Sequence, residues 1–161
     1  MIEIVNRQRL VAVNRDCIKE LAANVLCIAA PLSGIPSDAS LTIALVRDST
    51  IRKLNCDFRN KDQETDVLSF PGGQIEFPDD ENTDDAYLGD IVISTDTAAR
   101  QARQAAITIE RQIQELVMHG ILHLCGYDHE SDNGQMNRLE LRLRKKLLDR
   151  PRTKSRSAVS A

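Results

Sequence analysis

The stretch from Glu115 to His129 contains all three histidines of the chain. His119 and His123 are four residues apart, so on a helix their imidazoles share one face and can bind the same cation. Gly126 stands where such a helix would end, because glycine adopts the left-handed conformation of a C-terminal cap without steric cost. The turn after Gly126 can then bring His129 back towards the other two. Three imidazoles with one open position form the ligand set of a catalytic zinc site, although nickel or copper would bind the same ligands.

The residue after the first histidine separates this pattern from that of a peptidase. Metzincin peptidases share the histidine spacing but carry a glutamate directly after the first histidine, as the general base. Here that position is Gly120, which cannot accept a proton. Glycine inside a helix costs up to about 1 kcal/mol relative to alanine, so we expect Gly120 to leave space for substrate beside a metal ligand.

Three stretches of the chain resemble signatures of the YbeY family, bacterial metal-dependent endoribonucleases that act in ribosomal RNA maturation. The metal stretch matches the family pattern His-Gly-x-Leu-His-Leu-x-Gly-Tyr-Asp-His from His119 to His129. Residues 58–71 are similar to a second signature, Phe-Arg-x-Lys-Asp-x-x-Thr-Asp-Val-Leu-Ser-Phe-Pro, and residues 88–94 read Leu-Gly-Asp-Ile-Val-Ile-Ser, which is also family-like. The resemblance implies that His119, His123 and His129 bind the metal.

The second signature contains two cations, Arg59 and Lys61, on a loop between ordered elements. Taken alone, such a pair is typical of a solvated loop. The resemblance instead implies that Arg59 lies near the metal and is required for catalysis, with Lys61 beside it for RNA binding. A guanidinium grips phosphate with two parallel hydrogen bonds and neutralises charge on phosphoryl oxygens. Because the metal helix lacks a glutamate base, the arginine suits a phosphodiester better than a peptide.

Several other side chains are candidates for supporting roles, each with a structural alternative. Glu115 lies one turn before His119 and could orient it as a carboxylate behind the ligand, or could simply be exposed. Asp128 could do the same for a ligand from the turn. Asp90 could face the substrate cleft as proton acceptor, or make a structural hydrogen bond. Cys125 could bind the metal, but we expect it to be a small apolar filler.

Composition and local patterns set the fold class. A chain of 161 residues is expected to be one domain, residues 1–150, followed by a disordered basic tail, residues 151–161. The net charge of −3 neither favours nor excludes nucleic acid, and an acidic run at residues 76–85 is expected to be solvated. No apolar run approaches the roughly 20 residues of a membrane span, and no signal peptide is expected. Four cysteines without a C-x-x-C pair fit reduced thiols in the cytoplasm.

Hydrophobic periodicity predicts an α+β domain with a small mixed sheet of about four strands packed with helices, including a metzincin-like metal helix. We expect the metal helix to open onto a cleft lined by strand 87–94 and the Arg59 loop. The predicted strands are 2–5, 41–46, 67–70 and 87–94. Five helices are predicted, starting at Asn14 or Asp16, at Asp48 or Ser49, at Ser94 to Asp96, at Glu110 and at about Gln135. We expect Pro31 to end the first helix, and the last to run to Leu148.

The resemblance implies a metal-dependent endoribonuclease that prefers single strands, matures the 3′ end of small-subunit ribosomal RNA and takes part in ribosome quality control. The expected cofactor is one zinc ion per chain. The expected partners are ribosomal RNA, small-subunit proteins and assembly factors, and no membrane association is expected. The alternatives are a non-enzymatic assembly factor with a structural metal, and a metallopeptidase.

Overall fold

The computed structural model describes residues 1–72 and 87–149. Its four strands form one mixed sheet in the order β1-β2-β4-β3. The first three strands in that order, β1 (Ile2–Asn6), β2 (Ser40–Val46) and β4 (Tyr87–Ser94), are parallel. The edge strand β3 (Val67–Pro71) runs antiparallel to β4. The predicted α+β class with a four-stranded mixed sheet is confirmed, whereas the acidic run 76–85 and the basic tail lie outside the described residues.

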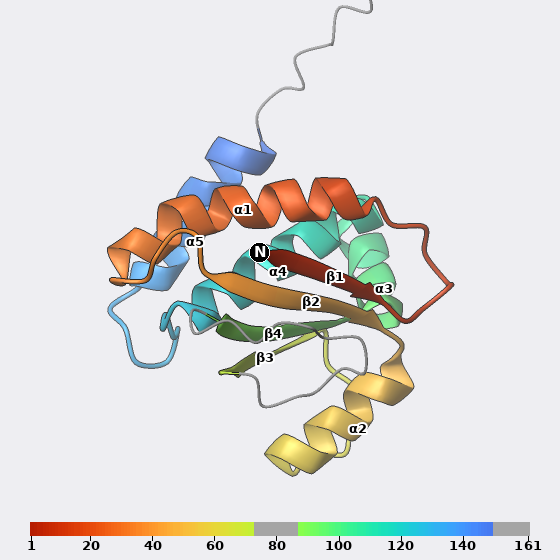
Figure 1. Ribbon diagram of the computed structural model, residues 1–161. Coiled ribbons are helices and arrows are strands. Elements are labelled where there is room, and N and C mark those ends of the chain that lie inside the picture. The colour runs from red at the N-terminus through yellow and green to blue at the C-terminus, as the bar shows by residue number, and fades with distance from the viewer. Residues whose placement is uncertain (73–86, 150–161) are drawn as a thin grey trace, which may run out of the picture.

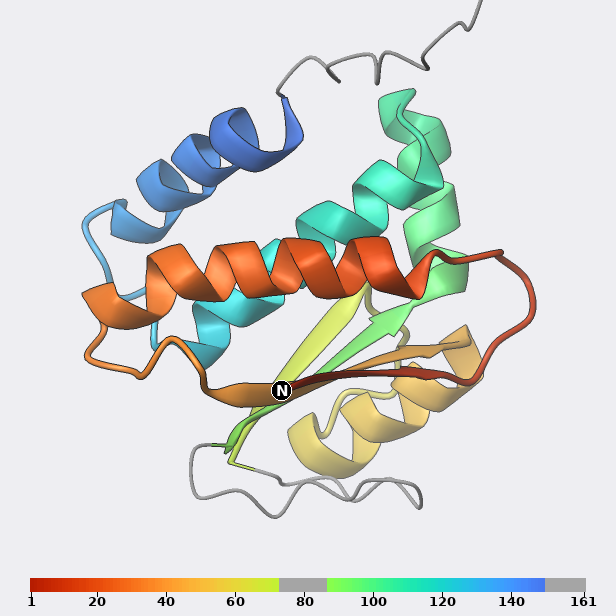
Figure 2. The same cartoon turned by 45° about the horizontal axis from the view of Figure 1, so that its top comes forward.

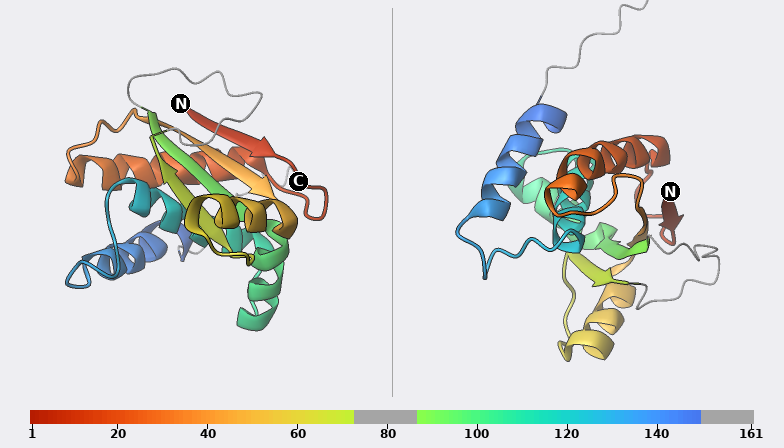
Figure 3. Two further views of the ribbon diagram at one scale, coloured as in Figure 1. Left: turned by 90° about the horizontal axis from the view of Figure 1, so that it is seen from below. Right: turned by 60° about the vertical axis from the view of Figure 1, so that its left-hand side comes forward.

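Helices cover both faces of this sheet (Figure 1). Helices α1 (Arg15–Leu32) and α4 (Ile109–Leu124) pack on one face, and α2 (Asp48–Arg59) lies across the other, as the view from below in Figure 3 shows. Helix α3 (Thr95–Ala105) follows β4 directly. Helix α5 (Gln135–Leu143) and a π-helical segment, η1 (Arg144–Leu148), lie outside α1 and α4 (Figure 2). The last helix was predicted as one α-helix from residue 135 to 148, and its final turns are π-helical instead.

The strand registers separate two apolar cores. The row Ile4–Ile43–Ile91 crosses β1, β2 and β4 and faces α1 and α4 in the larger core. The row Val5–Ala44–Val92–Leu68 faces α2 in the smaller one. On β3 the first row ends at Ser69, which pairs with Ile91. A polar residue therefore takes the last place of an apolar row, at the edge of the sheet where α4 passes.

Gly120 allows α4 to lie directly on the sheet. A Cβ at this position would be 2.7 Å from Cγ2 of Ile91 on β4, closer than real Cβ contacts come. Ser69 Oγ also donates to the Gly120 carbonyl across 3.3 Å, which ties β3 to the same helical turn. The expected space for substrate at Gly120 is therefore wrong, because Ile91 fills it.

Local signals explain most helix ends. Asn14, one of two predicted caps, accepts a hydrogen bond from Cys17 N at the start of α1, and Ser94 and Thr108 cap α3 and α4 in the same way. Gly126, with φ +95°, follows α4 as predicted. Pro31 does not stop α1, which continues to Leu32, because a proline in the last turn removes only one helical hydrogen bond.

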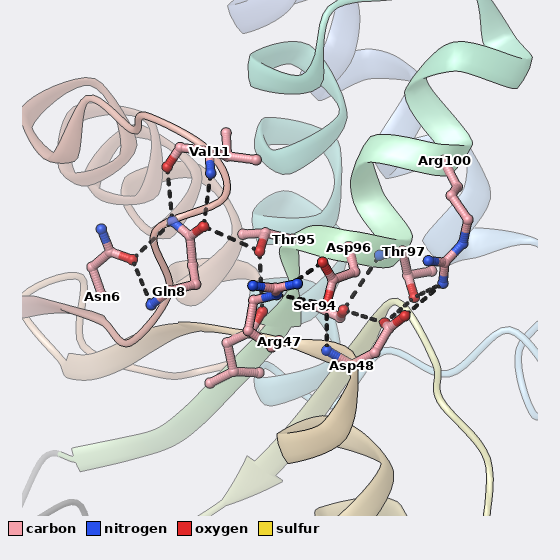
Figure 4. Close-up of polar contacts among 11 residues, drawn as sticks. Asn6, Gln8, Val11, Arg47, Asp48, Ser94, Thr95, Asp96, Thr97 and Arg100 are labelled. Carbon is pink, nitrogen blue, oxygen red and sulfur yellow. Dashed lines mark hydrogen bonds and ion pairs between the residues drawn. The ribbon is translucent and has the colours of Figure 1, made fainter.

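Asp48 was expected to cap α2, but its carboxylate serves another helix (Figure 4). The N-cap of α2 is Arg47, without a side-chain cap. Asp48 accepts hydrogen bonds from Ser94 Oγ (2.6 Å), Thr97 Oγ1 (2.7 Å) and Arg100 Nη2 (2.8 Å) at the start of α3. The carboxylate thus joins α2 to the end of β4 and to α3.

Two further findings bear on the predicted environment. No helix among the described residues is both long and apolar enough to cross a bilayer. All four cysteines are free thiols.

Candidate metal and nucleic-acid site

The three histidines converge beside the edge strand β3. His119 and His123 lie on successive turns of α4, and their Nε2 atoms are 2.9 Å apart. The turn after Gly126 brings back His129, whose ring centroid lies 5.5 Å from that of His119 and 6.3 Å from that of His123. The structure therefore brings together the three residues that the spacing singled out.

His123 is kept neutral and oriented. Burial lowers the pKa of His123, and the neighbouring imidazoles His119 and His129 add to this, while a backbone hydrogen bond with Tyr127 opposes it. Because Nε2 of His123 faces His119, the bond with Tyr127 is made at Nδ1. A neutral imidazole that donates from Nδ1 keeps the lone pair on Nε2, which is the form that binds a metal ion.

Glu140 on α5 joins this cluster and was not foreseen from the sequence. The residue is only 6% exposed, and its Oε1 lies 2.6 Å from Nδ1 of His119 and 3.8 Å from Nε2 of His129. Burial alone would raise the pKa of Glu140, but the hydrogen bond with His119 and the nearby charges of His119, His129 and Arg144 hold it below its ordinary value. Among the described residues, His119, His129 and Glu140 have donor atoms within 4.8 Å of one another, and His123 is not part of this group. They form a possible metal-ligand set beside the three histidines that the spacing predicts.

A signal for Glu140 was present in the sequence. It lies four residues after Met136 and three before Leu143, inside the apolar stripe of α5 that packs on the core. A carboxylate on a buried stripe needs a partner, because burying an unpaired charge is costly. The sequence did not name that partner, which the structure shows to be His119.

The predicted supporting carboxylates lie elsewhere. Glu115 does not orient His119, since its carboxylate pairs with Arg111 at 3.2 Å and lies 3.8 Å from Arg144. Asp90 is fully buried and accepts a hydrogen bond from the Tyr87 hydroxyl. It alternates with Ile91, which faces α4, and so lies on the α2 side of the sheet. The structural alternative for Asp90 holds, and the cleft-facing one is wrong.

Two other predicted residues are placed near the histidines. Cys125 is buried directly after α4, and burial raises the pKa of its thiol to about 11. A thiol that resists ionisation is a poor metal ligand, in keeping with a small filler. Asp128 lines the same pocket as the histidines and accepts a hydrogen bond from Glu130 N.

A pocket of about 620 Å³ connects the histidines to Arg59. Arg59 is the last residue of α2, which Asn60 ends in the left-handed conformation, so it lies on a helix end instead of the expected loop. Lys61 is exposed in the segment that follows. The strand that lines the pocket is β3, not β4 as expected. The lining residues are Arg59, Asp66, Val67, Ser69, Pro71, His119, His123, Asp128, His129 and Glu130.

The donor set fits a divalent transition metal. Imidazole nitrogens with a nearby carboxylate are ligands that zinc, nickel and copper share. Tetrahedral zinc with Zn–N bonds of about 2.0–2.1 Å places two ligand nitrogens roughly 3.3 Å apart. The 2.9 Å between the Nε2 atoms of His119 and His123 is close to that spacing.

Comparisons with known proteins point to one family. A family model described as "Endoribonuclease YbeY" matches residues 3–148. The chain is 46% identical over 114 residues to the Endoribonuclease YbeY of Solibacter usitatus, covering 71% of this chain and 67% of that protein. It is 37% identical over 144 residues to that of Geobacter sulfurreducens, covering 89% and 91%. A solution structure of TM1509 from Thermotoga maritima has a TM-score of 0.56 at 25% identity, covering 98% of this chain and 99% of that one.

Proposed function

The chain belongs to the YbeY family of endoribonucleases, and we propose that it is a metal-dependent endoribonuclease acting on single-stranded ribosomal RNA. The observation that carries the proposal is the convergence of three imidazoles and Arg59 on one pocket. The same proposal includes maturation of the 3′ end of small-subunit ribosomal RNA and a role in ribosome quality control. It also includes small-subunit proteins and assembly factors as partners, and a cytoplasmic location.

Within this proposal, His119, His123 and His129 hold one zinc ion per chain. The bound ion would polarise a phosphoryl oxygen or lower the pKa of a water molecule. Arg59, at the opposite side of the pocket, holds the scissile phosphate and neutralises its developing charge. Lys61 adds a second positive charge along the RNA backbone.

The proton acceptor of the reaction is to be sought among groups that reach the pocket. Asp90 is excluded because it is fully buried and does not line the pocket. Asp66, Asp128 and Glu130 line the pocket. Asp66 already accepts hydrogen bonds from Val67 N and Gln101, which hold its carboxylate in place. A nucleophilic water or an RNA 2′-hydroxyl can transfer its proton to one of these three carboxylates.

An exposed aromatic ring beside Arg59 supports the preference for single strands. Phe58 is 47% exposed, and its ring packs edge-on against the buried ring of Phe70, with centroids 5.1 Å apart. Unpaired bases stack on such faces, whereas the bases of a duplex are already stacked on one another. Arg59 for the phosphate and Phe58 for a base are consecutive in the chain.

The structure gives a metallopeptidase no further support. Gly120 stands where peptidases carry their base, and it packs against Ile91. A glutamate introduced there would be pushed against β4 and away from the histidine pocket. Gly120→Glu therefore cannot serve as the simple restoration of a base.

The first test compares the parent protein with His123→Ala on end-labelled ribosomal RNA, single-stranded and in duplex, with bound metal quantified. We expect the parent to hold about one metal per chain and to cut single strands preferentially, and the variant to do neither. Glu110→Ala, exposed at the other end of α4, is the matched control. Equal cleavage by parent and His123→Ala would refute the proposal. The assembly factor would be favoured by two results together. The parent would bind RNA without cutting it, and His123→Ala would lose metal and stability but still bind RNA.

A further inference from the structure

We propose that Glu140 is a positioning residue, which fixes the protonation pattern of the His119 ring so that Nε2 is free for the metal. The inference rests on the metal site of the proposed function and assigns Glu140 a place behind a ligand instead of a place among the ligands. Its Oε1 accepts a hydrogen bond from Nδ1 of His119 across 2.6 Å.

The two nitrogens of His119 face different partners. Nε2 faces Nε2 of His123 at 2.9 Å, and Nδ1 faces Glu140. One ring cannot bind a single ion through both nitrogens, because their lone pairs point in different directions. An ion shared with His123 must therefore be bound by Nε2 of His119, and an ion shared with Glu140 by Nδ1. The two possible ligand sets are mutually exclusive.

The orientation of His123 favours the set in which His119 binds through Nε2. Its Nδ1 is occupied by the backbone of Tyr127, and its Nε2 has no use in a set made of His119, His129 and Glu140. Both rings on α4 then follow one pattern: each is held at Nδ1 by an acceptor of the protein and presents Nε2 to the other. Metal-binding histidines commonly have such a partner at the second nitrogen, which fixes the tautomer and strengthens the ligand.

Glu140 is itself held in place. It is 6% exposed on the buried stripe of α5, and its second oxygen lies 4.0 Å from Nη2 of Arg144 on the next turn. Nε of Arg144 lies 3.8 Å from Glu115, which pairs with Arg111. The carboxylate that supports His119 is thus supported by a chain of charges between α5 and α4.

The test measures zinc affinity, by competition with a chromophoric chelator, in the parent, Glu140→Ala, Glu140→Gln and Glu110→Gln. Loss of a partner behind a ligand typically costs about 10–100-fold in metal affinity, so we expect that loss for Glu140→Ala. Glu140→Gln keeps an acceptor oxygen and should lie between Glu140→Ala and the parent. Glu110→Gln, a charge change at the exposed start of α4 that lies outside this chain of charges, should bind zinc as the parent does.

A second readout identifies the ring nitrogens directly. Nitrogen-15 NMR of the histidine rings should show a proton on Nδ1 of His119 in the zinc-free parent at pH 8, where an ordinary imidazole is neutral. Zinc should then bind Nε2 while that proton remains. In Glu140→Ala the zinc-free ring should shift towards the Nε2–H form. A merely structural role for Glu140 would leave the tautomer unchanged.

Each outcome separates the inference from the proposed function. Unchanged zinc affinity in Glu140→Ala, or a parent His119 protonated on Nε2, overturns the inference while leaving RNA cleavage by the parent intact. Zinc on Nδ1 of His119 overturns it in favour of Glu140 as a ligand. Should Glu140→Ala fail to fold, Glu140→Gln and the spectrum of the parent still decide. If the parent binds zinc as described but does not cut RNA, the proposed function fails and the inference stands.

Discussion

Arg59 and the histidines reach the pocket from opposite sides, which divides the proposed chemistry between separate residues. The histidines come from α4 and the turn after it, whereas Arg59 ends α2 on the other side of the sheet. They meet around the edge strand β3, whose residues Val67, Ser69 and Pro71 line the pocket between them. At the scale of residues, Arg59 is therefore the group to test for phosphate binding without disturbing the metal ligands.

Arg59→Ala should lower RNA cleavage by about 100-fold or more, because a group that stabilises charge in the transition state is lost. Arg59→Lys should recover only part of this, since an ammonium carries the charge but cannot bind phosphate with two parallel hydrogen bonds. Single-turnover cleavage measures both. Zinc content should be unchanged, and Lys53→Ala, an exposed cation on the same helix, is the control. Full activity in Arg59→Ala would remove Arg59 from the mechanism.

At the scale of elements, the site depends on how closely α4 approaches the sheet. Gly120 and Ile91 set that distance, and the Ser69 hydroxyl bonds the Gly120 carbonyl at the same level. Because His119 directly precedes Gly120, any displacement of α4 from β4 also moves the first metal ligand. Packing and metal binding are therefore coupled through the contacts of Gly120 with Ile91 and Ser69.

Gly120→Ala should destabilise the protein by about 1–3 kcal/mol, the usual cost of an added methyl group in a filled core. The gain of about 1 kcal/mol in helix propensity opposes this cost, but the methyl group would lie 2.7 Å from Ile91 Cγ2. Denaturant unfolding measures the change. Ile91→Ala provides the control: the double variant should lose less stability than the sum of the two single variants. Strict additivity would show that the contact with Ile91 is not the cause.

At the scale of the whole molecule, the two cores are joined at one end of the sheet by charged and hydroxyl groups (Figure 4). Asp48 bonds Ser94, Thr97 and Arg100, while both carboxylate oxygens of Asp96 lie 2.9 Å from Nε of Arg47. These bonds connect α2, which carries Arg59, to β4 and α3. The position of Arg59 relative to the histidines depends on this connection.

Asp48 should make stability pH-dependent in acid. Burial opposes ionisation of Asp48, but the hydrogen bonds from Ser94, Thr97 and Arg100 outweigh it and lower the pKa of the carboxyl. A lowered pKa in the folded state stabilises the protein above the unfolded pKa of about 3.9, and this stabilisation is lost as the pH falls through the folded value. Asp48→Asn should cost about 1.5–3 kcal/mol at pH 6, and less at pH 3.

Urea unfolding of the parent and Asp48→Asn from pH 3 to pH 7 checks this prediction. Asp62→Asn is the control, because Asp62 and its partner Arg52 are exposed, and exposed pairs contribute little. A difference between parent and Asp48→Asn that stays constant across the range would mean that the charge of Asp48 does not matter.

The sequence alone indicated those features that lie within a few consecutive residues. The spacing of His119, His123 and Gly126 placed two imidazoles on one helical face and a cap after them, because helical periodicity is a local property. Short apolar runs, with weak alternation in the first, likewise predicted β1, β2 and β3 to within one residue at either end and β4 with its observed bounds. The resemblance covered the same local stretches and identified the family that the comparisons show.

Tertiary structure decided what depends on which elements meet. Spacing could not show that Glu140, 21 residues from His119, lies behind it. Nor could it show that β3 instead of β4 borders the pocket, because that follows from the strand order β1-β2-β4-β3, which leaves β4 inside the sheet. The packing of Ile91 beneath α4 closed the space at Gly120, and alternation along β4 then turned Asp90 to the α2 side of the sheet. These contacts join distant segments, and only the packed fold, in which each strand and helix must bury its apolar face, determines them.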